Sequence, residues 1–336
     1  MNEKIDFVIL WVDGSDPKWL KDKEKYNPNK IKKDGVNGTI RFRDWDNLKY
    51  WFRGVEKFAP WVNNIYFITY GHLPKWLNTS HPKLKIIKHE DYIPKKYLPV
   101  FSSNPIELNL NRIKELSEYF VLFNDDMFLI NDVKPTDFFI NNLPVDNYNE
   151  VNLDMRKEDP TFRSILKNNY RVLSNLYNKQ KVVLLHPYKY LNYKYGFSRN
   201  IRTLKNTLTK KEFVGINNNH IYQPFLKSYF NKAWSIIYDE MDNTSKNRFR
   251  DPTDINQFLI RYFQLLDGSF VPKDYLSGKY FAASGNNCEI ISYIEEQKGS
   301  CICINDTDPN IDFEKCKKEI NNAFDKILKD KSSFEK

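Results

Sequence analysis

The chain has 336 residues, of which 52 are Lys or Arg and 43 are Asp or Glu, so its formal net charge is +9. With 41% hydrophobic and 28% charged residues, its composition is that of a folded globular protein and excludes a disordered chain. Its 11 glycines and 16 prolines exclude collagen-like and proline-rich chains, and no apolar run approaches the roughly 18–20 residues that a membrane span needs.

Apolar runs and amphipathic segments alternate over the first part of the chain. Residues 5–12 form a continuous apolar run typical of a buried central strand, and Ser15 or Asp16 can cap a helix that begins near Pro17. The polar residues 21–38 predict a mobile loop. An amphipathic helix follows and is ended by Pro60; its apolar residues at helical spacing are Leu48, Trp51, Phe52, Val55 and Phe58.

Three further apolar runs predict the next strands, over residues 62–70, 84–89 and 119–123. A turn around residues 76–77 separates the first two, and residues 107–118 predict a helix before the third. This alternation of helices and apolar strands favours an α/β sheet with parallel strands.

The second half of the chain has a different pattern. Residues 141–209 are rich in Asn, Lys and Tyr and are less periodic, whereas residues 224–266 have a strongly helical pattern. Short strands are predicted near Tyr280 and over residues 301–304, and an amphipathic helix over residues 313–328.

All the cysteines fall in the last quarter of the chain: Cys288, Cys301, Cys303 and Cys316. None forms a CxxC pair and no histidine follows at zinc-finger spacing, so we expect reduced cysteines that pack as small hydrophobic residues. Cys301 and Cys303 would share one face of a strand.

The positive charge gives little information about partners. Lysines are scattered with acids between them, and no RNP-like, zinc-finger or basic-zipper pattern accompanies them, so we expect no nucleic-acid partner. The N-terminal apolar run leads directly into acids instead of a cleavage site, which predicts a cytoplasmic protein. Basic surface without a span predicts that any membrane association is peripheral, on the inner face of the cell membrane.

Three of the apolar runs end in acidic or amide side chains. Asp13 follows the first run, Asn124-Asp125-Asp126 follows the run over 119–123, and Asn305-Asp306 follows the run over 301–304. Ligands of open α/β sheets bind beyond the carboxyl ends of the strands. If these ends converge, they form an oxygen site for Mg²⁺ or Mn²⁺; an ordinary turn or helix cap is the alternative for each.

Arginine and histidine supply the complementary chemistry. Two pairs of arginines occur in the sequence Arg-Phe-Arg: Arg41 with Arg43, and Arg248 with Arg250. Their guanidinium groups can bind phosphate oxygens through two hydrogen bonds each. The alternative is that each arginine pairs with a neighbouring acid, Asp44 or Asp251. His220 follows a polar asparagine run and is a candidate general base, although a lone histidine is commonly structural.

Four long stretches of the chain resemble the Stealth family. Its first two conserved regions resemble IDFVILWVDGSDPKW, RFRDWDNLKYWFRGVEKFAPWVNNIYFITYGHLPKWLN and LPVFSSNPIELNLNRIKELSEYFVLFNDDMF. The third is similar to HIYQPFLKSYFNKAW with NRFRDPTDINQFLIRYFQLLDGSFVP, and the fourth to CICINDTDPNIDFEKCKKEINNAFDKILKDKSSFEK. The stretches occur in the family's order and cover nearly the whole chain outside residues 130–210.

The resemblance implies a fold and an activity. Stealth proteins are sugar-phosphate transferases of microbial capsule and cell-wall polysaccharide synthesis, similar to the catalytic part of N-acetylglucosamine-1-phosphotransferase. We therefore expect one catalytic domain over residues 1–336, with a Rossmann-like, GT-A-like mixed sheet flanked by helices and a helical C-terminal portion. Within it, residues 1–130 would bind the nucleotide sugar, residues 131–210 the acceptor, and residues 211–336 would complete the site.

The resemblance also implies roles for individual residues. The expected catalytic residues are His220, Asp13, Arg250 and Asp125. The expected donor-binding residues are Arg43, Asn104, Glu107, Asn124 and Arg248. The expected ligands of Mg²⁺ or Mn²⁺ are Asp126, Asn305 and Asp306. The chain departs from the family's usual pattern at His72, where glutamine is common, and at Pro105, where a small residue is usual.

The expected reaction moves hexose-1-phosphate, or its N-acetylhexosamine counterpart, from a UDP-sugar to an acceptor hydroxyl and releases UMP. His220 is the expected base, with Asp13 as its alternative. On the residues alone, a metal-dependent glycosyltransferase that releases UDP would use the same strand-end acids and stays an alternative. A polyanion-binding protein would need a clustered basic face. The acids at the strand ends argue against this alternative.

Overall fold

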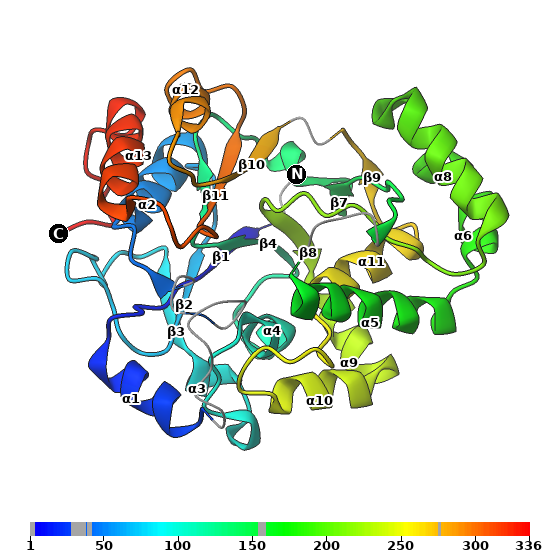
Figure 1. The fold of residues 1–336 in the computed structure, drawn as a ribbon, viewed down its shortest axis with the longest axis horizontal. Helices are drawn as coiled ribbons and strands as arrows, with labels where there is room; N and C mark the ends of the chain where they lie inside the picture. Colours follow the sequence, from blue (N-terminus) through cyan, green and yellow to red (C-terminus); the bar gives the residue numbers. More distant parts are fainter. Residues whose placement is uncertain (1–3, 28–37, 39–41, 154–158, 275–276) are drawn as a thin grey trace.

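A five-stranded sheet forms the centre of the computed structural model, which describes residues 4–27, 38, 42–153, 159–274 and 277–336 (Figure 1). Its strands are β3 (Leu84–Lys88), β2 (Ile65–Thr69), β1 (Ile5–Leu10), β4 (Tyr119–Asn124) and β8 (Gln223–Leu226), in that order. The first four are parallel, and β8 is antiparallel to β4. The order 3-2-1-4 is the one with which the Rossmann sheet order 3-2-1-4-5-6 begins.

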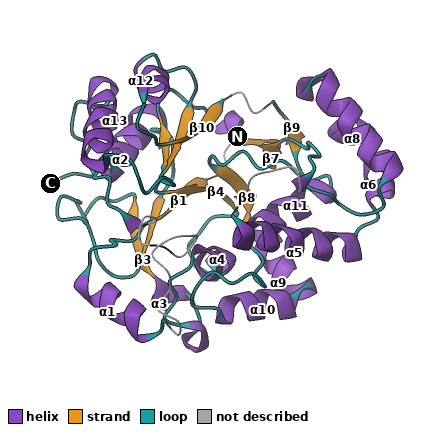
Figure 2. Cartoon of the chain, viewed as in Figure 1, coloured by secondary structure: helices purple, strands orange, loops and turns teal. Residues whose placement is uncertain are grey.

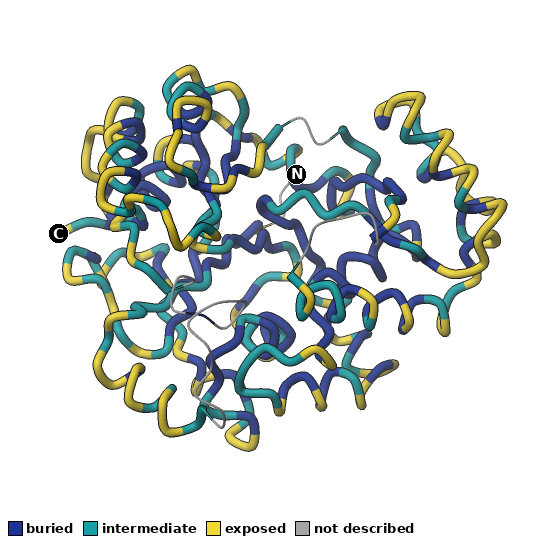
Figure 3. Tube along the Cα trace, viewed as in Figure 1, coloured by how far each residue is buried: buried dark blue, intermediate teal, exposed yellow. Residues whose placement is uncertain are grey.

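Helices cover both faces of this sheet (Figure 2). Because side chains alternate along a strand, Phe7 and Ile9 of β1 enter one hydrophobic core and Val8 enters the other. The first core is closed by α2 (Leu48–Phe58), α12 (Cys288–Glu295) and α13 (Phe313–Ile327). The second core is closed mainly by α5 (Pro160–Leu176), α9 (Lys227–Ile236) and α11 (Phe258–Leu266). In Figure 3 the buried part of the trace follows the sheet between them.

A second sheet joins the C-terminal part of the chain to the end of β4. It consists of β10 (Gly278–Ala282), β11 (Cys301–Asn305) and β5 (Met127–Leu129), with β11 parallel to β10 and antiparallel to β5. Only Asp125 and Asp126 separate β4 from β5. The pairing of β11 with β5 therefore brings residues after position 300 to the carboxyl end of β4.

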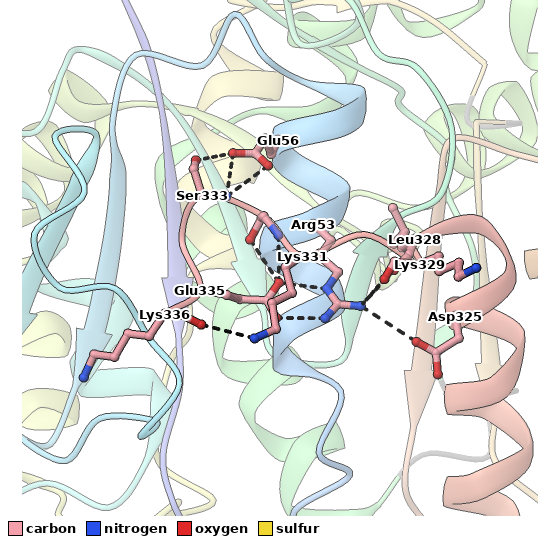
Figure 4. A network of polar contacts seen from close by, with 10 residues as sticks. Arg53, Glu56, Asp325, Leu328, Lys329, Lys331, Ser333, Glu335 and Lys336 are labelled. Atoms are coloured by element: carbon pink, nitrogen blue, oxygen red, sulfur yellow. Dashed lines mark hydrogen bonds and ion pairs between the residues drawn. The ribbon is translucent and has the colours of Figure 1, made fainter.

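Helix α2 holds the last residues of the chain (Figure 4). Arg53 forms an ion pair with Glu335 at 2.8 Å and donates to the carbonyl of Leu328 at 2.9 Å. On its other side α2 lies against β5 so closely that a Cβ on Gly54 would be 2.7 Å from the carbonyl oxygen of Leu129. The helix thus connects the second sheet to the C-terminal tail.

The remaining elements surround these layers. The other helices are α1 (Pro17–Lys25), α3 (His89–Tyr92), α4 (Ser103–Leu108), α6 (Lys179–Leu185), α7 (Pro187–Tyr190), α8 (Phe197–Thr209) and α10 (Tyr238–Lys246). A small sheet consists of β6 (Phe139–Ile140), β7 (Leu143–Asp146) and β9 (Val271–Pro272). Short 3-10 turns cover Lys95–Tyr97, Leu110–Arg112, Pro135–Asp137 and Tyr193–Tyr195. Among the described residues, no helix is both long enough and apolar enough to cross a membrane.

The predicted fold class is confirmed: a Rossmann-like, GT-A-like mixed sheet flanked by helices, with a helical C-terminal portion. Three of the predicted elements match closely: Asp16 caps α1 by accepting from the Trp19 amide, α2 ends two residues before Pro60, and α13 begins at Phe313. The division of the chain into donor, acceptor and completing parts stays a prediction.

Four predicted elements need correction. The helix predicted over residues 107–118 is instead α4 and a 3-10 turn, because Ser102 caps a helix that starts at Ser103. The predicted loop over 21–38 begins with the last residues of α1, and its residues 28–37 lie outside the described part of the chain. The described part of the less periodic stretch over 141–209 contains four α-helices, and the helical pattern over 224–266 begins with β8.

Candidate active site

A cavity of about 1060 Å³ lies at the carboxyl ends of β1 and β4. Ten of the twelve predicted site residues line it: Arg43, Asn104, Glu107, Asn124, Asp125, Asp126, His220, Arg250, Asn305 and Asp306. They come from segments far apart in the chain, which the two sheets bring together. The predicted convergence of the second and third strand ends is therefore confirmed.

Asp126 is the centre of a polar cluster in this cavity. Its Oδ2 accepts a hydrogen bond from Nδ2 of Asn305 at 3.0 Å and lies 3.5 Å from Nε2 of His220. Burial disfavours the ionised Asp126 carboxyl, but His220 and the donors Asn305 and Cys303 outweigh burial and lower its pKa below the ordinary value. Asp126 is therefore an anion that His220 faces.

The cluster fits a divalent cation. Oδ1 of Asp126 is buried and has no hydrogen-bond partner among the described residues, so this oxygen has capacity for a further ligand. Single ligand atoms of Asp126, His220 and Cys303 lie within 4.8 Å of one another. Carboxylate and amide oxygens suit Mg²⁺ and Mn²⁺. Asp126 and Asn305 thus carry the chemistry that the predicted cation site needs.

Arg43 and Asp306 are paired with each other. Nε and Nη2 of Arg43 donate to the two oxygens of Asp306 at 2.8 and 2.5 Å, and Nε1 of Trp45 donates to the same carboxylate at 3.1 Å. Arg43 therefore meets an acid, but this acid is 263 positions away and is not the neighbour Asp44. Arg41 lies outside the described residues. Both oxygens of Asp306, a predicted cation ligand, are already engaged.

A second group of polar side chains comes from α4. Arg250 donates to Oγ of Ser103 at 3.2 Å, and Nδ2 of Asn104 donates to Asp254 at 2.9 Å. Glu107 is buried, and burial raises its pKa to about 8 although Arg250 and Ser103 oppose that rise. This wall of the cavity thus carries one guanidinium beside a carboxyl that stays protonated at neutral pH.

Two predicted residues do not line the cavity. Oδ1 of Asp13 accepts from the amide and the hydroxyl of Ser15, as in an ordinary turn, and the Asp13 amide donates to Nε2 of His72 at 2.7 Å. A glutamine oxygen at position 72 could accept the same bond. Arg248 lies with its guanidinium 4.8 Å from the ring centre of Tyr26.

The prediction missed several lining residues, among them Asn217, Asn218, Asn219, Arg199 and Tyr280. The asparagine run directly before His220 was the available signal, whereas Tyr280, whose ring centre lies 5.8 Å from that of His220, stands in an ordinary strand pattern. The cysteines are free, and Cys301, Cys303 and Cys316 are buried as expected, while Cys288 is exposed. The position of Cys303 beside Asp126 was not foreseen.

Comparison with known proteins decides the family. Residues 3–31 and 41–146 match the family models described as Stealth protein conserved region 1 and conserved region 2. The chain is also 43% identical to the capsular polysaccharide phosphotransferase WcwK of Streptococcus pneumoniae, over 99% of this chain and 98% of the relative. The chain belongs to the Stealth family. The predicted family is therefore confirmed.

Two other relatives that match nearly the whole chain are also polysaccharide phosphotransferases. The exopolysaccharide phosphotransferase cps2G of Lactiplantibacillus plantarum is 39% identical over 99% of this chain and 96% of its own length. The receptor polysaccharide phosphotransferase WefC of Streptococcus gordonii is 37% identical over the full length of both chains. A structural alignment with the bifunctional glycosyltransferase WbbM covers 97% of this chain and 51% of that one at 10% identity, with a TM-score of 0.37. This Stealth protein is a transferase.

Proposed function

We propose that this Stealth protein transfers hexose-1-phosphate or N-acetylhexosamine-1-phosphate from a UDP-sugar to a hydroxyl of a growing capsular or cell-wall polysaccharide. One observation carries the proposal: the anionic Asp126 shares a cavity with His220 and Arg250, and one of its buried oxygens has no hydrogen-bond partner in the described part of the chain. The polysaccharide phosphotransferases that match the whole chain support it. The cavity of about 1060 Å³ is large enough for a nucleotide sugar.

In the proposed reaction, an acceptor oxygen attacks the β-phosphorus of the donor. A new phosphorus–oxygen bond forms to the acceptor, the bond from the β-phosphorus to the bridging oxygen breaks, and UMP leaves with the electrons of that bond. The acceptor proton goes to His220, which Asp126 faces at 3.5 Å and would stabilise when protonated. The bond between the sugar and its phosphate stays intact, so the anomeric configuration is retained.

The chain's own residues would hold and balance the charges of the donor. Asp126 and Asn305, with Asp125 beside them, would hold Mg²⁺ or Mn²⁺. The cation would neutralise charge on the diphosphate. Arg250 would bind the transferred phosphoryl oxygens, because a guanidinium fork matches them in shape and charge. Arg43 already engages Asp306, so we assign it to holding the cavity wall.

The remaining cavity residues would bind the donor and the acceptor. Asn104, Glu107 and Asn124 line the cavity beside the catalytic groups and are the proposed donor contacts. A protonated Glu107 can donate a hydrogen bond to a donor oxygen. The acceptor would enter past the helices of residues 131–210, from which Phe162 and Arg199 reach the cavity. We place the reaction on the cytoplasmic side of the membrane.

The nucleotide product tests this function. The protein is incubated with Mg²⁺ or Mn²⁺, a panel of UDP-sugars and an oligosaccharide primer, and the released nucleotide is identified. Transfer of sugar phosphate must release UMP and place a phosphodiester, visible by ³¹P NMR, in the product. Release of UDP with no phosphorus in the product would contradict the proposal and would identify a glycosyltransferase.

A further inference from the structure

The interpretation of the lysines as scattered with acids between them needs correction, because the positive charge of the chain is concentrated in one segment. Residues 160–211 contain twelve Lys and Arg and no Asp or Glu, whereas the whole chain has a net charge of +9. The rest of the chain is therefore slightly acidic. In Figure 1 this segment is drawn in green and includes α5, α6 and α8, with α6 and α8 at the outer edge of the molecule.

Helix α8 turns its apolar side away from the protein. Phe197, Ile201, Leu204 and Leu208 follow one another at intervals of four, three and four residues, so they form one stripe along the helix. Their exposed fractions are 83%, 49%, 41% and 64%. The side chains that α8 buries are Thr203 and Thr207, each 1% exposed. A surface helix of a globular protein normally has the opposite arrangement.

Several polar bonds attach α8 to the neighbouring elements. Arg202 donates to the carbonyl of Glu150 and to the side chain of Asn149, both at 2.7 Å. Gln180 and Lys179 of α6 donate to the carbonyls of Thr207 and Asn206 at 3.1 and 3.0 Å. None of these bonds involves a side chain of the apolar stripe, and the exposed part of the stripe stays available for another surface.

The neighbouring elements add to the apolar area. Leu184 and Leu185 at the end of α6 are 67% and 61% exposed, and Tyr188 and Tyr193 are 61% and 83% exposed. With the stripe of α8, these account for eight of the fourteen large hydrophobic side chains that lie exposed in the described part of the chain. Tyrosine is enriched where proteins meet the membrane–water interface.

We propose that α8 docks on an anionic lipid bilayer, with Phe197, Ile201, Leu204 and Leu208 entering the interface. The exposed Lys205 lies on α8, and the exposed Lys210 and Lys211 directly follow the helix. The segment contains no acid that would repel a negative surface. A second copy of the chain does not suit this face, because two basic segments would repel each other. A bilayer supplies both the apolar and the anionic partner.

This docking has a consequence for the cavity. Arg199, in the first turn of α8, lines the cavity and forms an ion pair with Asp274 at 3.2 Å. The apolar stripe begins two residues earlier, at Phe197. Docking of α8 therefore brings one wall of the cavity to the membrane. The inference goes beyond the proposed function and does not rest on it, since binding to lipid needs no donor or acceptor.

Vesicle binding by the full chain tests the inference. The probes are vesicles of phosphatidylcholine alone and of phosphatidylcholine with one quarter phosphatidylglycerol, and binding is measured by co-sedimentation. We expect binding to the anionic vesicles to be about tenfold tighter or more, and to weaken as salt rises. The double variant Phe197→Ser with Leu208→Ser should bind about tenfold more weakly, because both apolar contacts are lost.

Two further variants separate the contributions. Lys205→Gln with Lys210→Gln should weaken binding and reduce its dependence on salt. The matched control is Leu20→Ser with Ile236→Ser, whose side chains are 45% and 44% exposed elsewhere; it should bind like the wild type. Thermal unfolding verifies that each variant is folded.

Failure of wild-type binding to anionic vesicles, or unchanged binding of the Phe197 and Leu208 double variant, overturns the inference. Binding of an acidic protein without binding to vesicles also overturns it. With a short water-soluble acceptor, the double variant should release UMP at the wild-type rate. Lost lipid binding with normal turnover and lost turnover with normal lipid binding are thus distinguishable.

Discussion

Arg43 and Asp306 lie 263 positions apart in the chain and form a two-point ion pair in the cavity wall. Arg43 precedes α2, and Asp306 directly follows β11. The pair therefore connects the segment that leads into the first core with the end of the second sheet. Trp45 donates to the same carboxylate, so both oxygens of Asp306 already accept hydrogen bonds from within the protein.

This pair should contribute measurably to stability. In a double-mutant cycle of Arg43→Gln and Asp306→Asn, we expect a coupling of about 1–3 kcal/mol, as for charge-assisted hydrogen bonds with little exposure. Urea denaturation measures it. The exposed pair Lys315 and Glu319 is the control and should couple by about 0.5 kcal/mol or less. Coupling near zero for Arg43 and Asp306 would show that the pair is not structural.

Removal of the divalent cation should abolish transfer. Asp126→Asn keeps the shape of the side chain but removes the charge, so kcat/KM should fall about 10³-fold, since a bound cation stabilises the transition state by several kcal/mol. The binding of Mn²⁺, followed by electron paramagnetic resonance, should weaken as well. Asp132→Asn, at an exposed position, is the matched control. Full wild-type activity in excess EDTA is the result that this prediction forbids.

His220→Ala should lower turnover far more than donor binding. A general base acts in the transition state, so we expect kcat to fall by about 10²–10⁴-fold while the Kd for the donor changes about threefold or less. His186→Ala, at an exposed histidine, should leave both constants unchanged. If turnover of His220→Ala stays near that of the wild type, His220 is not the base.

Glu107 should make stability depend on pH. Its pKa is about 8 in the folded protein against an ordinary value of 4.5, so between these pH values the unfolded chain is ionised there and the folded protein is not. The stabilising contribution is thus complete below pH 4.5 and is lost as pH rises through 8. The loss is on the order of 4 kcal/mol.

Urea denaturation at pH 5 and pH 8 measures this dependence. Glu107→Gln cannot ionise, so its stability relative to the wild type should improve as pH rises through this range. Glu115→Gln, at an exposed carboxyl, should follow the wild type at both pH values. Parallel curves for the wild type and Glu107→Gln would mean that the Glu107 carboxyl is ionised in the folded protein.

The local sequence was sufficient to predict a strand together with the polar residues that directly follow it. The run ending in Asn124-Asp125-Asp126 is buried, continuous and abruptly polar, so both β4 and the cluster at its end could be predicted. The contact of Asp126 with Asn305 could be expected only if the two strand ends converge. The sequence around position 305 does not indicate that β11 pairs with β5.

The errors have equally local causes. Leu108, Leu110, Ile113 and Leu116 are all buried and suggest one long helix, but the chain turns repeatedly between them. The partner of Arg43 could not be predicted, since a guanidinium suits a phosphate and a carboxylate equally well. In α8 the apolar spacing identifies a stripe but cannot say whether the protein or another surface covers it.

The late position of β11 also affects when activity can begin during synthesis. Asn305 and Asp306 belong to the cavity wall, and α13 and the tail that Arg53 holds come after them. A nascent chain that has emerged only as far as β8 can form the central sheet but lacks this wall. A chain shortened before β11 would therefore lack the Asn305 side chain that donates to Asp126 at the proposed cation site.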